Sequence, residues 1–210
     1  STGTKNVLVG GLAGDALTTG VHNIVIGRGA LSTEDAHGYN IAIGGYALAD
    51  QDAGQNAYNI AIGYEAGKDV TTGISNVLIG GLAGDVLTSG DSNVAIGKNA
   101  MGAADGSESN NVAIGYGTLA NMNWNASNYN TAVGYAAGTS VSTGLENTLI
   151  GGNAGTSITS ATQCTLIGDY AGDALTTGHY NVAVGAYALS SEDEGKNNVA
   201  IGRQALATLN

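Results

Sequence analysis

The chain has 210 residues, of which 35 are Gly, none is Pro or Phe and 11% are charged, which excludes an ordinary globular domain with a core of large side chains. Its 17 acidic residues outnumber the 6 basic ones and give a net charge of −11, so we expect no binding of nucleic acid and no insertion into membranes. Since no long apolar run is present and one cysteine cannot form an intrachain disulfide, stability is expected to come from geometry and association.

A motif of Asn, three apolar residues and Gly recurs over the whole chain. Repeats of 17 to 19 residues, numbered here as coils 1 to 12, begin at Asn6, Asn23, Asn40, Asn59, Asn76, Asn93, Asn111, Asn130, Asn147, Cys164, Asn181 and Asn198. Units this short bury little surface alone, so they must stack into one continuous core. We therefore predict an all-β, parallel β-solenoid, with residues 1–5 leading into a single repeat domain over residues 6–210.

Each repeat contains one short strand, which a Gly turn ends. In coil 3 the first and third apolar residues, Ile41 and Ile43, share one face, and we expect that face to point into the coil. The residue between them, Ala42, should then face outward and be buried by another chain or by another wall of the same coil. This interpretation predicts association, most simply as a homotrimer with parallel chains, which replacement of Ala95 and Ala113 by Asp should dissociate.

The recurring Asn is expected to form a ladder, because its side chain can bond backbone groups in the coils above and below. The ladder comprises Asn6, Asn23, Asn40, Asn59, Asn76, Asn93, Asn111, Asn130, Asn147, Asn181 and Asn198. In coil 10 the ladder is interrupted by Cys164.

The coils are of two kinds. In first-kind coils, Ala-Gly is followed by an apolar residue expected to plug the core, namely Leu17, Val70, Leu87, Val141, Ile158 or Leu175. In second-kind coils, Ala or Thr is followed by Leu or Met and a polar loop, which carries every insertion. Their order predicts super-repeats at residues 6–75 and 76–146, an extra coil at 147–163, a truncated copy at 164–210, and loops that recur on one side.

Residues 130–138 (Asn-Thr-Ala-Val-Gly-Tyr-Ala-Ala-Gly) and 198–206 (Asn-Val-Ala-Ile-Gly-Arg-Gln-Ala-Leu) resemble the repeats of phage tail fibres and related bacterial surface proteins. The shared pattern, apolar-Ala-Ile-Gly-x-x-Ala, is similar to the head repeats of trimeric autotransporter adhesins, although the coils here are longer. The resemblance covers residues 6–206. It implies left-handed coils in an extracellular homotrimeric fibre, on a virion or a cell surface, that attaches to host cells and carries no catalytic residues.

The loop at residues 121–129 is one of the two longest and holds the only Trp. Aromatic rings outside a rod have no core to fill, and sugars stack on them, while Asn side chains bond hydroxyl groups. The candidate glycan-binding residues are Asn123, Trp124, Asn125 and Tyr129. In the alternative interpretation, Trp124 folds back as a lid on an apolar wall.

Acidic residues gather in the second-kind loops, at Glu34, Asp35, Asp50, Asp52, Asp105, Glu108, Glu192, Asp193 and Glu194. They form either a solvated rim that opposes aggregation or a loose calcium site, so a monomeric calcium- or sugar-binding solenoid is the alternative function. No other cofactor or metal is expected.

Histidine catalysis and ice binding are two further functions that the sequence could indicate. The three histidines, His22, His37 and His179, lie in return loops, where corner packing is favoured over the interchain catalysis of β-helix acyltransferases. The Thr-Thr-Gly segments resemble ice-binding arrays, but loop-bearing coils interrupt them. Four tyrosines immediately precede the recurring Asn, and we expect their rings to stack on one another; they are Tyr39, Tyr58, Tyr129 and Tyr180.

Overall fold

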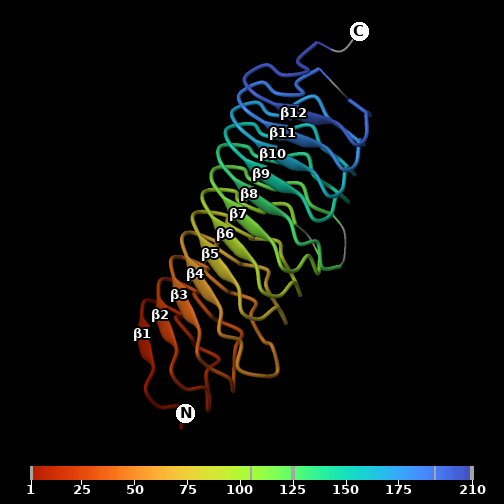
Figure 1. The fold of residues 1–210 in the computed structure, drawn as a ribbon. Helices are drawn as coiled ribbons and strands as arrows, with labels where there is room; N and C mark the ends of the chain where they lie inside the picture. Colours follow the sequence, from red (N-terminus) through yellow and green to blue (C-terminus); the bar gives the residue numbers. More distant parts are fainter. Residues whose placement is uncertain (1, 105, 124–125, 192, 209–210) are drawn as a thin grey trace.

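The chain forms an all-β rod in which twelve short strands stack in chain order into one parallel sheet (Figure 1). This architecture comes from a computed structural model that describes residues 2–104, 106–123, 126–191 and 193–208. The strands are β1 (Val7–Val9), β2 (Ile24–Ile26), β3 (Ile41–Ile43), β4 (Ile60–Ile62), β5 (Val77–Ile79), β6 (Val94–Ile96), β7 (Val112–Ile114), β8 (Thr131–Val133), β9 (Thr148–Ile150), β10 (Thr165–Ile167), β11 (Val182–Val184) and β12 (Val199–Ile201). The predicted parallel β-solenoid is confirmed.

Backbone hydrogen bonds join each coil to the next around the circumference, and not only along the strands. In the return path, the amide of Gly14 donates to the carbonyl of Ala30 at 2.9 Å, and the amide of Thr18 donates to the carbonyl of Asp35 at 2.7 Å. Most buried peptide groups therefore find partners in the neighbouring coil, which stabilises a rod whose side chains are small.

The predicted orientation of the strands is wrong. The middle residue of each strand points into the coil and is fully buried in most coils, as Ala42, Ala95 and Ala113 are, whereas the first and third residues are partly or fully exposed. The reason is the alternation of side chains along a strand. The Asn before the strand is buried in most coils, and the residue two positions after it, in the middle of the strand, lies on the same inward face. The inward position is occupied by apolar residues alone, from Ala42 to Leu78, so the interior holds no place for a charge. Asp at Ala95 or Ala113 would therefore test folding, not association.

The predicted Asn ladder is confirmed. In coils 5 to 7 the Oδ1 atom of Asn76 accepts the backbone amide of Asn93 at 2.9 Å, and Oδ1 of Asn93 accepts the amide of Asn111 at 3.0 Å. In most coils the side-chain amide also donates across the turn, as Nδ2 of Asn76 does to the carbonyl of Gly90 at 2.8 Å, whereas Nδ2 of Asn40 has no partner. A ladder Asn such as Asn76 thus satisfies one backbone group above it and one within its own coil.

Cys164 interrupts only half of the ladder. Its backbone amide still donates to Oδ1 of Asn147 at 3.0 Å, and its Sγ atom replaces the missing amide as a donor to the carbonyl of Gly178 at 3.3 Å. Sulfur is a weaker acceptor than an amide oxygen, so the backbone amide of Asn181, which bonds to the Cys164 sulfur, has a poorer partner than its counterparts have. Burial raises the pKa of the Cys164 thiol, which keeps it protonated and unreactive.

Gly after each strand allows the coils to stack closely. Gly44 adopts a φ of 136°, and a Cβ atom there would lie 2.2 Å from the carbonyl oxygen of Gly63 in the next coil. The same contact recurs from coil to coil, as at Gly97, where a Cβ would lie 2.3 Å from the oxygen of Gly115. The column of Gly therefore follows from backbone-to-backbone contact at this corner.

The two kinds of coil fill the same core space from different positions. In first-kind coil 5, Leu87 is buried and Gly84 stands at the turn, where φ is 55°. In second-kind coil 2, Leu31 takes the turn position with a φ of 46° and is fully buried, and Glu34 occupies the place of the plug. The predicted plugs are all buried. In second-kind coils, Leu adopts a left-handed backbone conformation, which costs conformational energy. Because this Leu fills the core, the residues after it can leave the core and form a polar loop.

Candidate functional site

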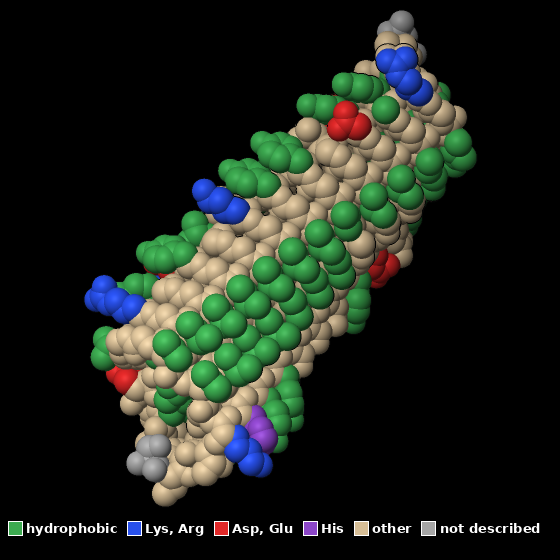
Figure 2. Space-filling model, turned by 90° about the vertical axis from the view of Figure 1, so that its left-hand side faces the viewer, with side chains coloured by type: hydrophobic (Ala, Val, Ile, Leu, Met, Phe, Trp, Pro, Cys, Tyr) green, Lys and Arg blue, Asp and Glu red, His purple; other side chains and the backbone are tan. Residues whose placement is uncertain are grey.

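The outward residues of the strands form a flat apolar surface along the whole rod, called here the strand face. It consists of the first and third residues of β1 to β12, which are Val7, Val9, Ile24, Ile26, Ile41, Ile43, Ile60, Ile62, Val77, Ile79, Val94, Ile96, Val112, Ile114, Thr131, Val133, Thr148, Ile150, Thr165, Ile167, Val182, Val184, Val199 and Ile201. None of them is charged, and hydrophobic side chains follow the rod in two columns in Figure 2. Contiguous apolar surface of this extent is rare on monomeric soluble proteins.

Exposure of the strand face varies along the rod. Ile24 and Ile62 are 38% and 36% exposed, whereas Val199 and Ile201 at the last coil reach 64% and 69% because no further coil covers them. One of the two columns carries Thr in β8, β9 and β10. The face is therefore apolar throughout and most purely aliphatic over β1 to β7.

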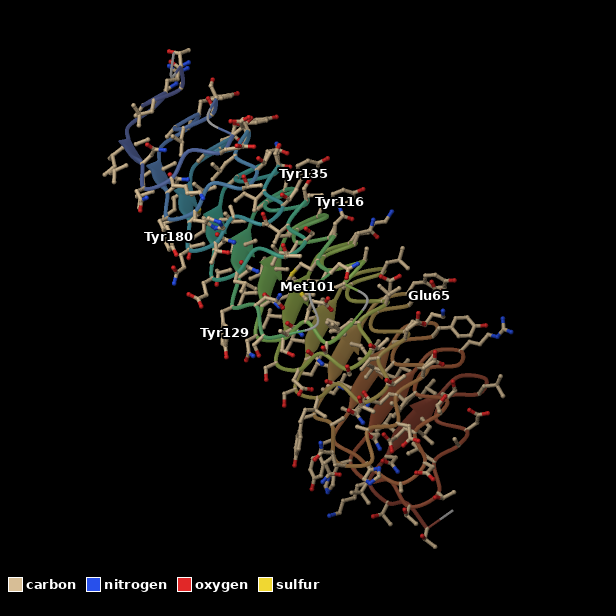
Figure 3. All side chains as sticks on the ribbon, turned by 90° about the vertical axis from the view of Figure 1, so that its right-hand side faces the viewer. Glu65, Met101, Tyr116, Tyr129, Tyr135 and Tyr180 are labelled. Carbon is tan, nitrogen blue, oxygen red and sulfur yellow. The ribbon has the colours of Figure 1, made fainter. Side chains whose placement is uncertain are left out.

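Aromatic residues line both edges of the strand face. The Asn-side rim, directly before the Asn corner, consists of His22, Tyr39, Tyr58, Tyr129 and Tyr180. The Gly-side rim lies one or two residues after the Gly that ends the strand. Directly after the Gly stand Tyr64, Tyr116 and Tyr135, and one residue further on stand Tyr46, Tyr170 and Tyr187. Figure 3 shows Tyr129 and Tyr180 on the opposite side of the rod from Tyr116 and Tyr135. Tyr is among the residues enriched at protein interfaces.

Neighbouring rings in each rim stack along the rod axis. Tyr39 packs on His22 and Tyr58 with centroid separations of 5.0 and 5.1 Å, which confirms the predicted stacking for this pair of tyrosines. In the Gly-side rim, the rings of Tyr116 and Tyr135 lie 5.4 Å apart and 8° from parallel. The Gly-side rim was not predicted, although the Gly-Tyr pairs in the sequence, such as 115–116 and 134–135, could have revealed it.

The loop of coil 7 projects from a base that is held by buried residues. Met122 plugs the core on one side, and Asn128 is buried on the other, where its Oδ1 accepts Nδ2 of Asn111 at 3.3 Å. The predicted glycan-binding residues Asn123 and Tyr129 are both exposed, Tyr129 at 57%. Their two companions, Trp124 and Asn125, lie outside the described residues. In Figure 1 the longer loops of coils 3 and 7 project on the same side of the rod, as expected.

The three histidines occupy separate places and form packing contacts. The ring of His22 stacks on Tyr39, and Nδ1 of His179 accepts the amide of Thr162 at 3.1 Å. The third ring, that of His37, lies with its Nδ1 3.2 Å from Oε1 of Glu34. Corner packing is thus observed for His22 and His179, while His37 belongs to a cluster of ionisable groups.

The hydroxyls of the Thr-Thr-Gly segments are used within the rod. Thr18 donates through Oγ1 to the carbonyl of Asp35 at 3.0 Å, and Thr71 donates to the carbonyl of Thr88 at 3.1 Å. These hydroxyls link consecutive coils, which favours a structural role over an ice-binding array.

Two aspartates of first-kind coils, Asp85 and Asp173, are partly buried. Burial raises the pKa of both Asp85 and Asp173, and one Oδ1 atom of each has no hydrogen-bond partner. Asp85 lines a hollow between coils 5 and 7 together with Asn99 and Asn121. At neutral pH these carboxylates cost the folded rod free energy.

Exposed ionisable groups interact mainly along one edge of coil 4. Lys68 forms an ion pair with Asp69 at 3.1 Å, which raises the pKa of the ammonium. The hydrogen bond and negative charge of Glu65 raise the pKa of the Tyr64 hydroxyl. Both contacts are solvent-exposed and contribute little to stability.

No family model, curated protein or solved structure matches this chain at a significant level. The resemblance to tail-fibre and adhesin repeats therefore rests on the repeat motif itself. Within the described residues, no helix is long and apolar enough to span a membrane.

Proposed function

We propose that this chain is a structural segment of an extracellular homotrimeric fibre, such as a phage tail fibre or a bacterial surface adhesin, and that it has no enzymatic activity. Three parallel rods would pack through their strand faces and present loops for attachment to cell-surface glycans. The observation that carries the proposal is the uncharged Val, Ile and Thr surface that runs over all twelve strands.

The size of the strand face favours association. Stacked strands advance about 4.8 Å each, so twelve strands give a face roughly 55 Å long and about 10 Å wide. The resulting area, about 550 Å² per chain before the aromatic rims are added, approaches the 800 Å² or so that each partner gives a standard interface. Burial of apolar surface contributes roughly 25 cal/mol per Å², so removing this face from water is strongly favourable.

The two rims favour a parallel arrangement of chains over an antiparallel pair. They differ in composition, because the Asn-side rim contains His22 and tyrosines, and the Gly-side rim adds Arg28, whose guanidinium lies 5.7 Å from the centre of the Tyr46 ring. When three parallel strand faces point toward one axis, the Asn-side rim of each chain meets the Gly-side rim of the next, and such contacts between unlike surfaces can close into a ring. An antiparallel face-to-face pair would instead place each rim against its own copy.

Native mass tests the association. We expect light scattering to give three times the chain mass, unchanged by a calcium chelator, for the purified 210-residue chain. Replacing Ile96 and Ile114 by Asp should reduce the mass to that of one chain, because two charges per chain would be buried at the axis. Thr72→Asp, at an exposed loop position away from the strand face, is the control and should stay trimeric.

The other outcomes discriminate between alternatives. A monomeric wild type that unfolds on chelation would support a calcium- or sugar-binding solenoid instead, and a dimer would contradict the threefold arrangement. A circular dichroism spectrum like that of the wild type would show that the Asp variant is folded. A folded Asp variant that remains trimeric would exclude the strand face as the interface.

Attachment is tested at the coil 7 loop. The trimer should bind a glycan array or host-cell surface, and Tyr129→Ala and Trp124→Ala should reduce that binding without changing the mass. Tyr180→Ala, the equivalent rim position without a long loop, is the matched control. Equal loss in the control would indicate that the rim, not the loop, binds glycan.

A further inference from the structure

Four ionisable side chains from two consecutive second-kind coils converge near the N-terminal end of the rod. Glu34, Asp35 and His37 come from coil 2 and Asp52 comes from coil 3, and one possible ligand atom of each lies within 4.8 Å of the others. Asp35 and Asp52 are exposed, His37 is partly exposed and Glu34 is fully buried. Neither Asp35 nor Asp52 forms an ion pair with Lys or Arg in the part of the chain that the structure describes.

Glu34 is anchored and yet incompletely bonded. Its Oε1 accepts the backbone amides of His37 at 2.9 Å and of Ala36 at 3.3 Å, and it lies 3.2 Å from Nδ1 of His37. Its Oε2 is buried and has no hydrogen-bond partner. An ionised oxygen in that state is costly unless a positive charge is close to it. A lone acidic cluster would not point to a ligand, but a buried carboxylate with one unpartnered oxygen at its centre does.

The equivalent residue of the next coil shows what a neutral side chain does at this position. Gln51 occupies the same place in coil 3, and both of its polar atoms are bonded: Oε1 accepts Nδ2 of Asn59, and Nε2 donates to the carbonyl of Thr71 at 3.2 Å. Beside Glu34 the amide that corresponds to that of Asn59 is Nδ2 of Asn40, at the start of coil 3, and it has no partner either. Polar packing alone would therefore be better satisfied by Gln, and the presence of Glu34 requires another explanation.

We propose that Glu34, Asp35, His37 and Asp52 bind one divalent transition-metal ion, of the class represented by Zn²⁺, that joins the loops of coils 2 and 3. Three carboxylates and one imidazole form a mixed oxygen and nitrogen donor set, which suits Zn²⁺ better than Ca²⁺, since Ca²⁺ takes six to eight oxygen ligands. The ion neutralises the cluster and gives the buried carboxylate its missing partner. This site is independent of the proposed fibre function.

The loops hold most of this site in place without the ion. The carbonyl of Asp35 accepts the amide of Thr18 at 2.7 Å, and the amide of Asp52 donates to the carbonyl of Thr71 at 2.9 Å. Tetrahedral ligands of Zn²⁺ lie about 3.4 Å apart, so donors that now lie within 4.8 Å of one another must approach by up to about 1.4 Å. Rotation of the exposed Asp35 and Asp52 side chains achieves this, while Glu34 stays fixed by its backbone bonds.

Calorimetric titration of the chelator-treated chain with ZnCl₂ tests the site. We expect one Zn²⁺ per chain and a higher midpoint of thermal unfolding when Zn²⁺ is added, because the ion binds the folded state. Glu34→Gln and His37→Gln should each lower the affinity by roughly a hundredfold, since even outer-shell partners of a metal contribute about 10–100-fold. Without metal, Glu34→Gln should be at least as stable as the wild type, with Gln51 as its precedent.

Matched controls separate this site from general surface binding. Asp193→Asn changes the coil 11 residue equivalent to Asp35, and His22→Gln removes a histidine of coil 1, so both should retain Zn²⁺. If Glu34→Gln fails to fold, Asp52→Asn, at an exposed position, provides the same test of affinity. Absence of binding, binding that survives Glu34→Gln or Asp52→Asn, or Ca²⁺ binding that is tighter than Zn²⁺ binding and indifferent to His37→Gln would each overturn the proposal.

Discussion

Coils 5 and 2 fill the same core with different residues, and the difference explains how one rod carries both smooth walls and polar loops. In coil 5 the buried side chains are Leu78 in the strand and Leu87 in the return path, around Gly84. In coil 2 they are Val25 and Leu31, and Glu34 replaces the plug. A large side chain at the turn leaves room for only a smaller one in the strand. Between these two coils a large core side chain thus moves to the turn, and its position decides whether the next residues can leave the core.

The largest expected effect comes from giving coil 5 the polar plug of a second-kind coil without the large side chain at the turn. Leu87→Gln should destabilise the rod by about 3–5 kcal/mol, because it empties part of the core and buries an amide without partners. The triple variant Leu78→Ala, Gly84→Leu, Leu87→Gln copies coil 3 and should recover about half of that loss. Urea unfolding followed by circular dichroism measures both changes. A triple variant no more stable than Leu87→Gln would contradict the idea of equivalent core filling.

A smaller, stabilising effect is expected at the corner that both kinds of coil share. Cys164→Asn gives the amide of Asn181 an oxygen acceptor in place of the weaker sulfur and should raise the stability by about 1 kcal/mol. The midpoint of urea unfolding should rise accordingly. Cys164→Ser, which can donate to the carbonyl of Gly178 but is too short to rebuild the ladder, serves as the control and should show no such gain.

The smallest effect concerns the aspartate after the turn Gly in coil 5, where coil 2 has Ser32. Since burial raises the pKa of Asp85 above its ordinary 3.8, the folded state holds the proton more tightly than the unfolded state. The stabilisation from protonation is complete below pH 3.8 and is lost as the pH rises through the folded-state pKa. Asp85→Asn should therefore raise the unfolding midpoint at pH 7 and have little effect near pH 3. Asp15→Asn, exposed in the first coil, should change little at either pH.

The repeat motif alone was sufficient to predict the parallel solenoid, the Asn ladder and the buried plugs, because each follows from a spacing that recurs in every coil. The stacked tyrosines at Tyr39 and Tyr58 followed from their shared place before the Asn. The Gly-side rim and the cluster around Glu34 were not predicted as units. Their members lie in different coils and become neighbours only when the coils are in register.

Sequence by itself determined the period, the strand in each coil and the residues at its corners, since short-range alternation and Gly turns are local properties. The direction in which each strand faces was decided by the tertiary structure. Ile41, Ala42 and Ile43 are all apolar, so hydrophobicity could not separate inside from outside. The buried Asn and the narrow coil made that choice, because they leave room inside for one strand residue and place the two larger ones on the outer surface.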